Sequence, residues 1–302
     1  MSTADLSGVI AAIATAIDEH GAPDCARSTA FARHLLANGC DGLNVLGTTG
    51  EATSFSLDER KRVMIAYRDA GLPLGRLMVG TGAASVSDAV ALTQHAAALG
   101  FGGALVLPPF YYKGVPDEGL VAYIDTIIGA TAAQPIPLYL YHFPAQSGLH
   151  WHLALIQSLL GAFGDRIVGL KDSSGDMAYA RAAAALRPSF KVFPSTEAAL
   201  MEARAGAFAG CISATANLNA DLCARAWRSG DAAALGQAVA IRKLFDGKQL
   251  VAGVKALIAQ IHRDPAWARV RPPLAPFAPA DHAAVVAGYD AVRSERMAMP
   301  AL

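Results

Sequence analysis

The 302-residue sequence predicts a (β/α)8 barrel, that is a TIM barrel, with a C-terminal helical extension. Two observations predict this fold class. Short apolar or β-branched runs alternate with amphipathic, alanine-rich segments, and eight such pairs follow one another. This alternation favours parallel strands with right-handed helical crossovers, and closure into a barrel leaves no exposed sheet edge. An open, doubly wound sheet is the alternative, but no G-x-G-x-x-G motif follows the first run.

Eight runs are predicted as strands because each is short, apolar and bounded by turn-forming residues. They cover residues 9–16, 42–46, 77–80, 103–107, 136–141, 167–170, 191–193 and 208–212. The segments between and after them have apolar residues at helical spacing. The helices predicted there cover residues 28–37, 57–70, 85–99, 117–132, 152–160, 176–186, 197–205 and 220–228.

Beyond residue 230 only helical patterns remain, at residues 231–245, 249–262 and 281–299, with a proline-rich stretch at 271–279. We therefore expect two parts, a barrel over residues 1–230 and a helical region over residues 231–302. The helical region is expected to cap the barrel, to pack against a partner subunit, or both.

The composition narrows the class of function. The chain has 53% hydrophobic residues, 25 basic and 25 acidic residues, and hence a formal net charge of zero. This balance gives no overall attraction to nucleic acid or to a membrane surface, and a small-molecule partner is expected. No apolar run reaches the length of a membrane span, and the first seven residues lack the basic start of a secretory signal. The four cysteines show neither C-x-x-C nor metal-binding spacing, which fits reduced thiols in the cytoplasm.

One lysine stands out near the middle of the chain. The apolar run 167–170 ends in Lys171, and the polar turn D-S-S-G follows at residues 172–175. Active sites of barrels gather at the carboxyl ends of the strands. Burial at such a position disfavours the charged ammonium form and leaves more neutral amine to attack a carbonyl. The alternative is an ordinary strand-end ion pair between Lys171 and Asp172.

Other strand ends also carry polar groups. The turn G-T-T-G-E at residues 47–51 combines two hydroxyls, backbone amides and close-approach glycines, which suits a small carboxylate. Phenols follow the fourth and fifth strands, in P-P-F-Y-Y at residues 108–112 and Y-L-Y-H-F-P at 139–144. Taken singly, the turn reads equally as a helix-capping loop and the tyrosines as rim packing. Their joint placement at strand ends favours a site.

Four of these segments resemble one known family. They are G-T-T-G-E at residues 47–51, Y-H-F-P at 141–144, G-L-K-D-S-S-G at 169–175 and G-C-I-S-A-T-A-N at 210–217. In this order they are similar to motifs of the dihydrodipicolinate synthase and N-acetylneuraminate lyase superfamily of pyruvate-dependent class I aldolases. The resemblance extends from the first strand to R-P-P-L at residues 271–274.

The resemblance implies a role for individual residues. Lys171 would form a Schiff base with pyruvate or another 2-keto acid, and Tyr141 would transfer protons at the aldol hydroxyl. Thr48 and Thr49, in the turn that begins at Gly47, would hold the pyruvate carboxylate. Thr48 would also link Tyr141 into a proton relay.

Two further positions follow from the same resemblance. Tyr112, or its neighbour Tyr111, would join the proton relay from across a subunit interface. Ile212 would line the pyruvate pocket as an apolar neighbour of Lys171. The family commonly assembles as a dimer of dimers, so a homo-oligomer is expected, and the lysine imine requires neither a metal nor an organic cofactor.

One position departs from the synthase branch. Dihydrodipicolinate synthases carry an arginine at the position of Gln146, and a neutral amide cannot replace a guanidinium that receives a carboxylate. The segment P-A-Q-S-G at residues 144–148 is more similar to the sugar-acid aldolase and sialic acid lyase branches. We therefore predict cleavage or formation of a 2-keto-3-deoxy sugar acid, or a related 4-hydroxy-2-keto acid, with pyruvate as one partner. The alternatives are 4-hydroxy-tetrahydrodipicolinate synthesis from pyruvate and aspartate semialdehyde, and dehydration of a keto-deoxy sugar acid.

Two hypotheses come from other classes. A non-catalytic pyruvate sensor would keep the pocket without turnover, but the chain has both Lys171 and Tyr141. A metal-dependent class II aldolase would need histidine and carboxylate ligands at strand ends. His142 has no partner at ligand spacing, and it is expected either to contact the aldehyde part of the substrate or to be a rim side chain.

Overall fold

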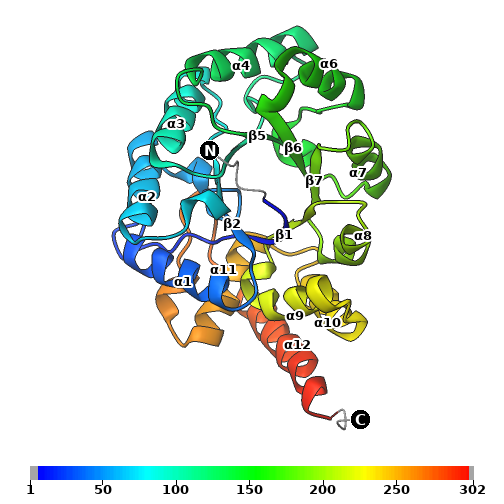
Figure 1. Cartoon of the computed structure of the whole chain (residues 1–302). Helices are drawn as coiled ribbons and strands as arrows, with labels where there is room; N and C mark the ends of the chain where they lie inside the picture. Colours follow the sequence, from blue (N-terminus) through cyan, green and yellow to red (C-terminus); the bar gives the residue numbers. More distant parts are fainter. Residues whose placement is uncertain (1–5, 299–302) are drawn as a thin grey trace.

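Eight parallel strands form a closed ring in the computed structural model, which describes residues 6–298 (Figure 1). Neighbouring strands are hydrogen-bonded in the order β7-β6-β5-β4-β3-β2-β1-β8. The ring closes between β7 and β8, where the Ala209 N–H donates to the Val192 carbonyl at 3.0 Å. The barrel prediction is thus confirmed, and the open sheet is wrong. The strands are β1 (Gly8–Ala12), β2 (Gly42–Val45), β3 (Leu77–Gly80), β4 (Gly103–Val106), β5 (Leu138–His142), β6 (Ile167–Asp172), β7 (Lys191–Pro194) and β8 (Gly210–Ser213).

Helices surround the ring, and local signals set their ends. A capping box of Ser56 and Glu59 begins α2, the Asp176 carboxylate caps α7, and left-handed Gly100 ends α3. The helices of the barrel are α1 (Cys25–Ala37), α2 (Leu57–Asp69), α3 (Val86–Leu99), α4 (Asp117–Ala130), α5 (Pro144–Ser147), α6 (Leu153–Phe163), α7 (Met177–Ala184), α8 (Leu200–Arg204) and α9 (Ala216–Ser229).

Apolar side chains fill two layers. One lies between the strands and the outer helices, and the second lies inside the ring. On β5, for example, Leu138 and Leu140 belong to the outer layer, whereas Tyr139 and Tyr141 belong to the inner one. Strands buried on both faces read as continuous apolar runs, which is why the sequence shows short runs and no strict alternation.

Some strand ends differ from the prediction. β1 ends at Ala12, although the chain stays buried to residue 17, with Thr15 as its polar member. β5 begins only after Pro137, because proline has no N–H for the sheet. β6 continues beyond the predicted residue 170, so Lys171 lies within the strand. The pairing of β5 with β6 shifts register after Leu138, and Val168 is the extra residue.

Two helices also differ. Residues 197–205 form a 3-10 turn (Glu197–Ala199) followed by α8 instead of one continuous helix. α9 begins at Ala216, four residues before the predicted start, and is kinked at Asn219, where φ is −137°. Residue 299 of the predicted last helix lies outside the described residues.

Three helices follow the barrel: α10 (Ala232–Lys243), α11 (Leu250–His262) and α12 (Pro279–Ala298). Figure 1 shows them together on one side of the ring next to α9, which α10 and α11 contact. Residues of α10, α11 and the loop between them line the cavity at the barrel mouth, so this region caps the barrel. The division of the chain at residue 230 stays a prediction.

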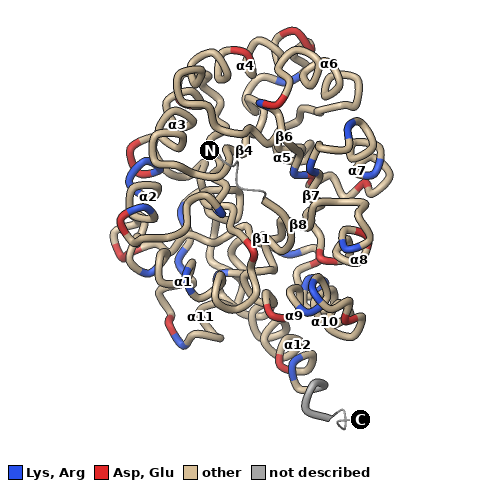
Figure 2. The backbone as a smooth tube through the Cα atoms, in the orientation of Figure 1, with Lys and Arg blue, Asp and Glu red and all other residues tan. Residues whose placement is uncertain are grey.

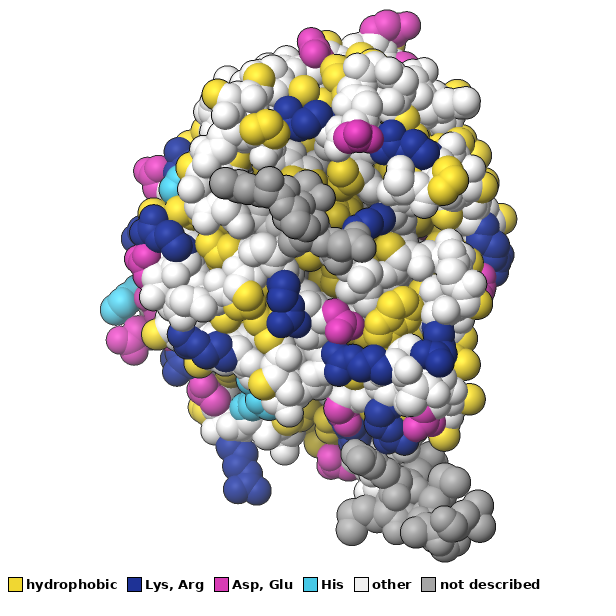
Figure 3. All heavy atoms as spheres, viewed as in Figure 1, with side chains coloured by type: hydrophobic (Ala, Val, Ile, Leu, Met, Phe, Trp, Pro, Cys, Tyr) yellow, Lys and Arg dark blue, Asp and Glu magenta, His cyan; other side chains and the backbone are white. Residues whose placement is uncertain are grey.

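The outer surface carries mixed charge. Lys and Arg alternate with Asp and Glu around the ring of helices (Figure 2), and the face in Figure 3 shows no extended patch of one sign. Within residues 6–298, no helix is both long enough and apolar enough to cross a membrane.

Candidate active site

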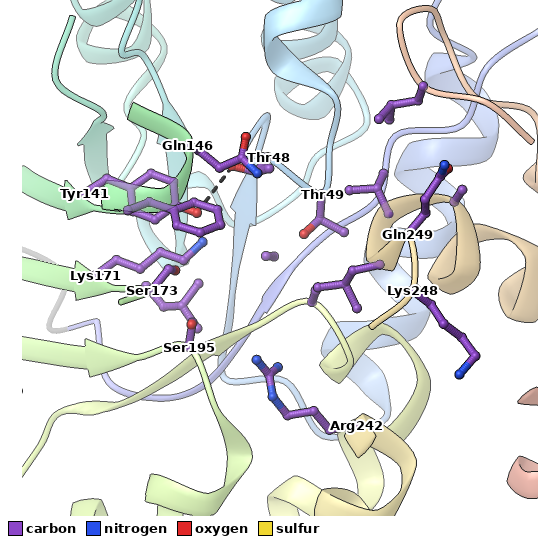
Figure 4. Close-up of a pocket in the computed structure, with 18 residues that line it drawn as sticks. Thr48, Thr49, Tyr141, Gln146, Lys171, Ser173, Ser195, Arg242, Lys248 and Gln249 are labelled. Carbon is purple, nitrogen blue, oxygen red and sulfur yellow. Dashed lines mark hydrogen bonds between the residues drawn. The ribbon is translucent and has the colours of Figure 1, made fainter. Parts of the chain in front are cut away.

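The carboxyl ends of the strands surround a cavity of about 450 Å³. This volume is typical of small-molecule sites. Figure 4 shows Tyr141 and Lys171 side by side on one wall, with Thr48 and Thr49 nearby. The 18 lining residues are Ala12, Thr48, Thr49, Tyr141, Phe143, Gln146, Lys171, Ser173, Ser195, Ile212, Ala214, Arg242, Lys248, Gln249, Leu250, Val251, Ala252 and Leu274.

Lys171 extends into this cavity from β6. Its strand partner is Tyr141 on β5, and the Lys171 Nζ lies 4.2 Å from the centre of the Tyr141 ring. The register shift at Val168 places Gly169 and Lys171 beside the inward-facing Tyr139 and Tyr141. The Lys171 residue is only 3% exposed. Its amine is therefore held against an aromatic wall at the base of the cavity.

Lys171 does not pair with Asp172. Successive residues of a strand point to opposite faces, and the Asp172 carboxylate instead accepts the Ser174 N–H at 3.0 Å. Within the described part of the chain, Lys171 has no ion-pair partner, and the cavity lining contains no acidic residue. The strand-end ion pair considered from the sequence is therefore wrong.

The Tyr141 hydroxyl is within hydrogen-bond distance of Thr48. The two oxygens are 3.3 Å apart, and either can donate. The backbone N–H groups of Thr48 and Thr49 have no hydrogen-bond acceptor among residues 6–298. The Thr49 hydroxyl and the two amides of this turn are thus available to a small carboxylate beside Lys171, while the Thr48 hydroxyl pairs with Tyr141.

The turn has an unusual backbone. Leu46, just before the turn, and Glu51, its last residue, have φ values of 53° and 54°, in the left-handed region that non-glycine residues rarely adopt. A Cβ on Gly47 would lie 2.5 Å from the Asn44 Oδ1, so any larger residue there would have to displace the buried Asn44 amide. The Thr15 hydroxyl donates to the Gly50 carbonyl at 2.9 Å and fixes the far side of the turn.

A buried ion pair connects this turn to the C-terminal helices. Glu51 is bonded to the Lys255 ammonium of α11, and both side chains are 0% exposed. The second oxygen of Glu51 accepts the Arg271 N–H at 2.8 Å. Burial lowers the pKa of Lys255, an effect that the neighbouring Glu51 carboxylate opposes. The conformation of residues 47–51 therefore depends on packing of the helices beyond the barrel.

The other predicted positions divide into two groups. Gln146 of α5 and Ile212 of β8 line the cavity, whereas Gly47 does not and borders a smaller cavity with Thr48 and Tyr141. Tyr111 and Tyr112 do not line it. They are 74% and 70% exposed and contact each other edge to face at 5.2 Å. The contribution of Tyr112 to the site of another subunit stays a prediction.

Sequence reasoning missed a polar wall of the cavity. Ser173 and Ser195 follow β6 and β7, and their hydroxyls face the cavity in Figure 4. Arg242 near the end of α10 points towards them, and Lys248 and Gln249 follow in the next loop. The serines stood at strand ends and could have been found by that rule. No local signal in residues 231–302 marks Arg242.

His142 neither lines the active-site cavity nor lies at its rim, the two positions expected from the sequence. It lies on the outer face of β5, is 4% exposed, and accepts the Trp151 N–H through Nδ1 at 3.2 Å. Its ring stacks on Tyr179 at 4.4 Å. Burial, aided by nearby His150, lowers the pKa of His142 to about 4. Both the substrate-contact and the rim interpretations were wrong, because Tyr141 faces the cavity and its neighbour must face away.

Metal ligands were also considered. Over residues 6–298, no group of three or more His, Cys, Asp or Glu side chains is placed to hold a metal ion. The metal-dependent aldolase alternative therefore has no ligand set in this part of the chain. The four cysteines are unpaired thiols, and burial raises the pKa of Cys40 to about 12.

Comparison with known proteins identifies the family. The model of the dihydrodipicolinate synthetase family matches residues 5–290. An uncharacterized DapA-like lyase of Chloroflexus aurantiacus is 32% identical over 300 residues, covering 96% of this chain and 98% of that protein. A 4-hydroxy-tetrahydrodipicolinate synthase of Synechococcus sp. is 40% identical, but over only 167 residues, 55% of this chain and 54% of that protein.

Two solved structures agree with these matches. Dihydrodipicolinate synthase from Agrobacterium tumefaciens superposes with a TM-score of 0.89 at 26% identity, covering 94% of this chain and 99% of that one. YagE of Escherichia coli K12, in complex with pyruvate, gives 0.86 at 25% identity and covers 95% and 98%.

Fold and cavity together define a (β/α)8 lyase of the class I aldolase type. The chain belongs to the dihydrodipicolinate synthetase family. The resemblance drawn from the four sequence motifs is thus confirmed at the level of the family.

Proposed function

We propose that the protein is a Schiff-base-forming aldolase that cleaves or forms a 2-keto-3-deoxy sugar acid, or a related 4-hydroxy-2-keto acid, with pyruvate as one partner. The observation that carries the proposal is the Lys171 amine, which lies in a cavity without acidic residues, 4.2 Å from the ring of Tyr141. An amine held in this way, without an ion-pair partner among the described residues, is placed to attack a ketone.

The first half of the reaction forms the imine. Lys171 Nζ attacks C2 of the 2-keto acid, whose carboxylate is bound by the Thr49 hydroxyl and by the amides of Thr48 and Thr49. Tyr141 protonates the hydroxyl of the resulting carbinolamine, which leaves as water, and a cationic iminium and a Tyr141 phenolate remain. The Thr48 hydroxyl, 3.3 Å from the Tyr141 oxygen, stabilises the phenolate by hydrogen bonding.

Bond cleavage then uses the iminium as an electron sink. The phenolate accepts the proton of the C4 hydroxyl, the C3–C4 bond breaks, and its electrons reach the nitrogen to form an enamine and a free aldehyde. Tyr141 returns the proton to C3, and water hydrolyses the imine to release pyruvate and Lys171. Addition of an aldehyde to the enamine is the reverse, synthetic reaction.

Two other reactions use the same imine. Dehydration of a keto-deoxy sugar acid would expel the hydroxyl in place of the aldehyde. Synthesis of 4-hydroxy-tetrahydrodipicolinate is favoured by the Synechococcus relative but opposed by neutral Gln146 in the cavity wall. A pyruvate sensor without turnover is the weakest candidate, because Lys171, Tyr141 and Thr48 lie together.

The proposal includes an oligomer in the cytoplasm. In a dimer of dimers, the exposed Tyr111 and Tyr112 would be covered by a neighbouring subunit, and Tyr112 would complete the proton relay there. Four unpaired thiols are consistent with a reducing compartment.

Pyruvate trapping tests the proposed function. The protein is mixed with pyruvate and borohydride, its intact mass is measured, and the adduct is located by peptide mapping. We expect one reduced pyruvate adduct on Lys171 and none in Lys171→Ala. A folded sample without an adduct, or with the adduct on another lysine, would show that the proposal is wrong. An adduct without turnover of any keto-deoxy acid, and without consumption of pyruvate with aspartate semialdehyde, would instead favour the sensor.

A further inference from the structure

The charge of the cavity exceeds what pyruvate needs. Three lining residues are basic, namely Lys171, Arg242 and Lys248, and none is acidic. Lys171 is used by the imine, and the pyruvate carboxylate has the turn of Thr48 and Thr49. In Figure 4 the Lys248 side chain runs away from the centre of the cavity, whereas the Arg242 guanidinium points into it. One guanidinium in the cavity therefore has no role in the proposed reaction.

Arg242 is held from behind. Its Nη1 donates to the Ser213 hydroxyl at 3.3 Å and lies 3.6 Å from Oε2 of Glu197. The Glu197 side chain is 0% exposed, and its other oxygen accepts the hydroxyls of Ser213, at 2.7 Å, and Thr215. The buried Glu197 carboxylate and the Ser213 hydroxyl thus hold one end of the guanidinium before any ligand arrives, and Thr215 in turn holds Glu197.

The rest of the guanidinium is available. The Nε and Nη2 groups of Arg242 have no acceptor among the residues that the structure describes, and the side chain is 29% exposed. The ion pair with Glu197 is longer than a hydrogen bond, so it offsets part of the charge without using a donor. A planar fork with free N–H donors is the geometry that binds a carboxylate in a bidentate manner.

The position of Arg242 in the cavity indicates which part of the substrate it contacts. The imine and its carboxylate occupy the wall formed by Lys171, Thr48 and Thr49. Arg242 comes from α10, on the side of the cavity that the C-terminal helices close. A substrate chain that extends from C3 away from the imine towards α10 therefore meets the Arg242 guanidinium.

We propose that Arg242 is a specificity-determining residue that binds a second carboxylate at the far end of the substrate. The preferred substrate is then a 2-keto-3-deoxy diacid and not the matching monoacid with a terminal hydroxymethyl group. This inference rests on the proposed Schiff-base function and adds the class of substrate to it.

The test compares two substrates that differ at one carbon. They are 2-keto-3-deoxygluconate, which ends in a hydroxymethyl group, and 2-keto-3-deoxyglucarate, which ends in a carboxylate. Loss of the 2-keto-3-deoxy acid is measured, so cleavage and dehydration are both detected. We expect the wild type to favour the diacid at least tenfold in kcat/KM. In Arg242→Gln, kcat/KM for the diacid should fall about 100-fold, mainly because KM rises. For the monoacid, kcat/KM should change less than about threefold.

Two controls separate binding from folding. Arg242→Gln leaves buried Glu197 without its cation, so the double variant Glu197→Gln/Arg242→Gln removes both charges together. It should show the same loss for the diacid alone. Arg242→Lys keeps the charge without the fork and should recover part of the preference. A merely structural role of Arg242 would lower turnover of both substrates equally.

The outcomes distinguish this inference from the function on which it rests. If pyruvate forms no adduct on Lys171 of the wild type, both are wrong. If the adduct forms, but the wild type turns over the monoacid equally well or does not turn over the diacid, only the role of Arg242 is overturned. An equal loss on both substrates in the double variant overturns it too. A loss confined to the diacid supports it.

Discussion

The buried pair of Glu51 and Lys255 should make a large contribution to stability that can be measured directly. Lys255→Met removes the ammonium but keeps an unbranched side chain of similar length. The Glu51 carboxylate would then be fully buried with only the Arg271 N–H as a partner. Removing one partner of a buried pair costs about 3–5 kcal/mol, because the remaining charge is uncompensated. We expect the free energy of unfolding to fall by that amount.

Urea unfolding of a variant series measures this effect. Lys255→Met should lower the midpoint without changing the slope of unfolding free energy against urea, and a lower slope would point to a changed unfolded state. Lys255→Met/Glu51→Gln removes both charges and should recover part of the loss. The reasoning is refuted if Lys255→Met lies within about 1 kcal/mol of the wild type. It is also refuted if the double variant is no more stable than the single one.

Three further predictions concern the site and its surroundings. Tyr141→Phe keeps the ring against Lys171 but removes the hydroxyl, so kcat should fall about 10²–10⁴-fold while the pyruvate adduct still accumulates slowly; an unchanged kcat would contradict the proton-transfer role. Thr49→Val removes one carboxylate donor and should raise the KM of the keto acid about tenfold, and an unchanged KM would place the carboxylate elsewhere. Burial lowers the folded-state pKa of His142 from 6.5 to about 4, so the unfolded chain binds a proton first as the pH falls. Its contribution to stability is complete above pH 6.5 and is lost towards pH 4. His142→Gln should therefore flatten the unfolding free energy over that range, and an unaltered slope would contradict the buried, neutral imidazole.

The fold could be predicted from the sequence because its signals are local. Each strand is an apolar run, each helix has its own spacing and caps, and their alternation leaves few topologies. The predicted strand boundaries were less accurate than the predicted fold, because single residues changed the hydrogen bonding there. β5 begins one residue after Pro137. The extra residue Val168 in β6 shifts the register, so that Lys171 points into the barrel.

The site was predictable only where it follows a strand. Lys171, Tyr141 and Thr48 could be placed by the rule that barrel sites gather at carboxyl ends, and the structure brings them together. Arg242 enters the cavity from a helix about 70 residues after Lys171, and no pattern in the sequence gives that approach. The direction of the His142 side chain was predicted wrongly. Side chains alternate along a strand, so His142 must point away from the cavity once Tyr141 points into it.

A crystal structure of the protein soaked with pyruvate tests the central claim most directly. We expect continuous density between Lys171 Nζ and C2 of pyruvate, with the carboxylate bound by the Thr49 hydroxyl and by the amides of Thr48 and Thr49. The Tyr141 oxygen should lie within hydrogen-bond distance of the former carbonyl site. Pyruvate bound elsewhere, or a free Lys171 amine at a pyruvate concentration that saturates the protein, would contradict the account.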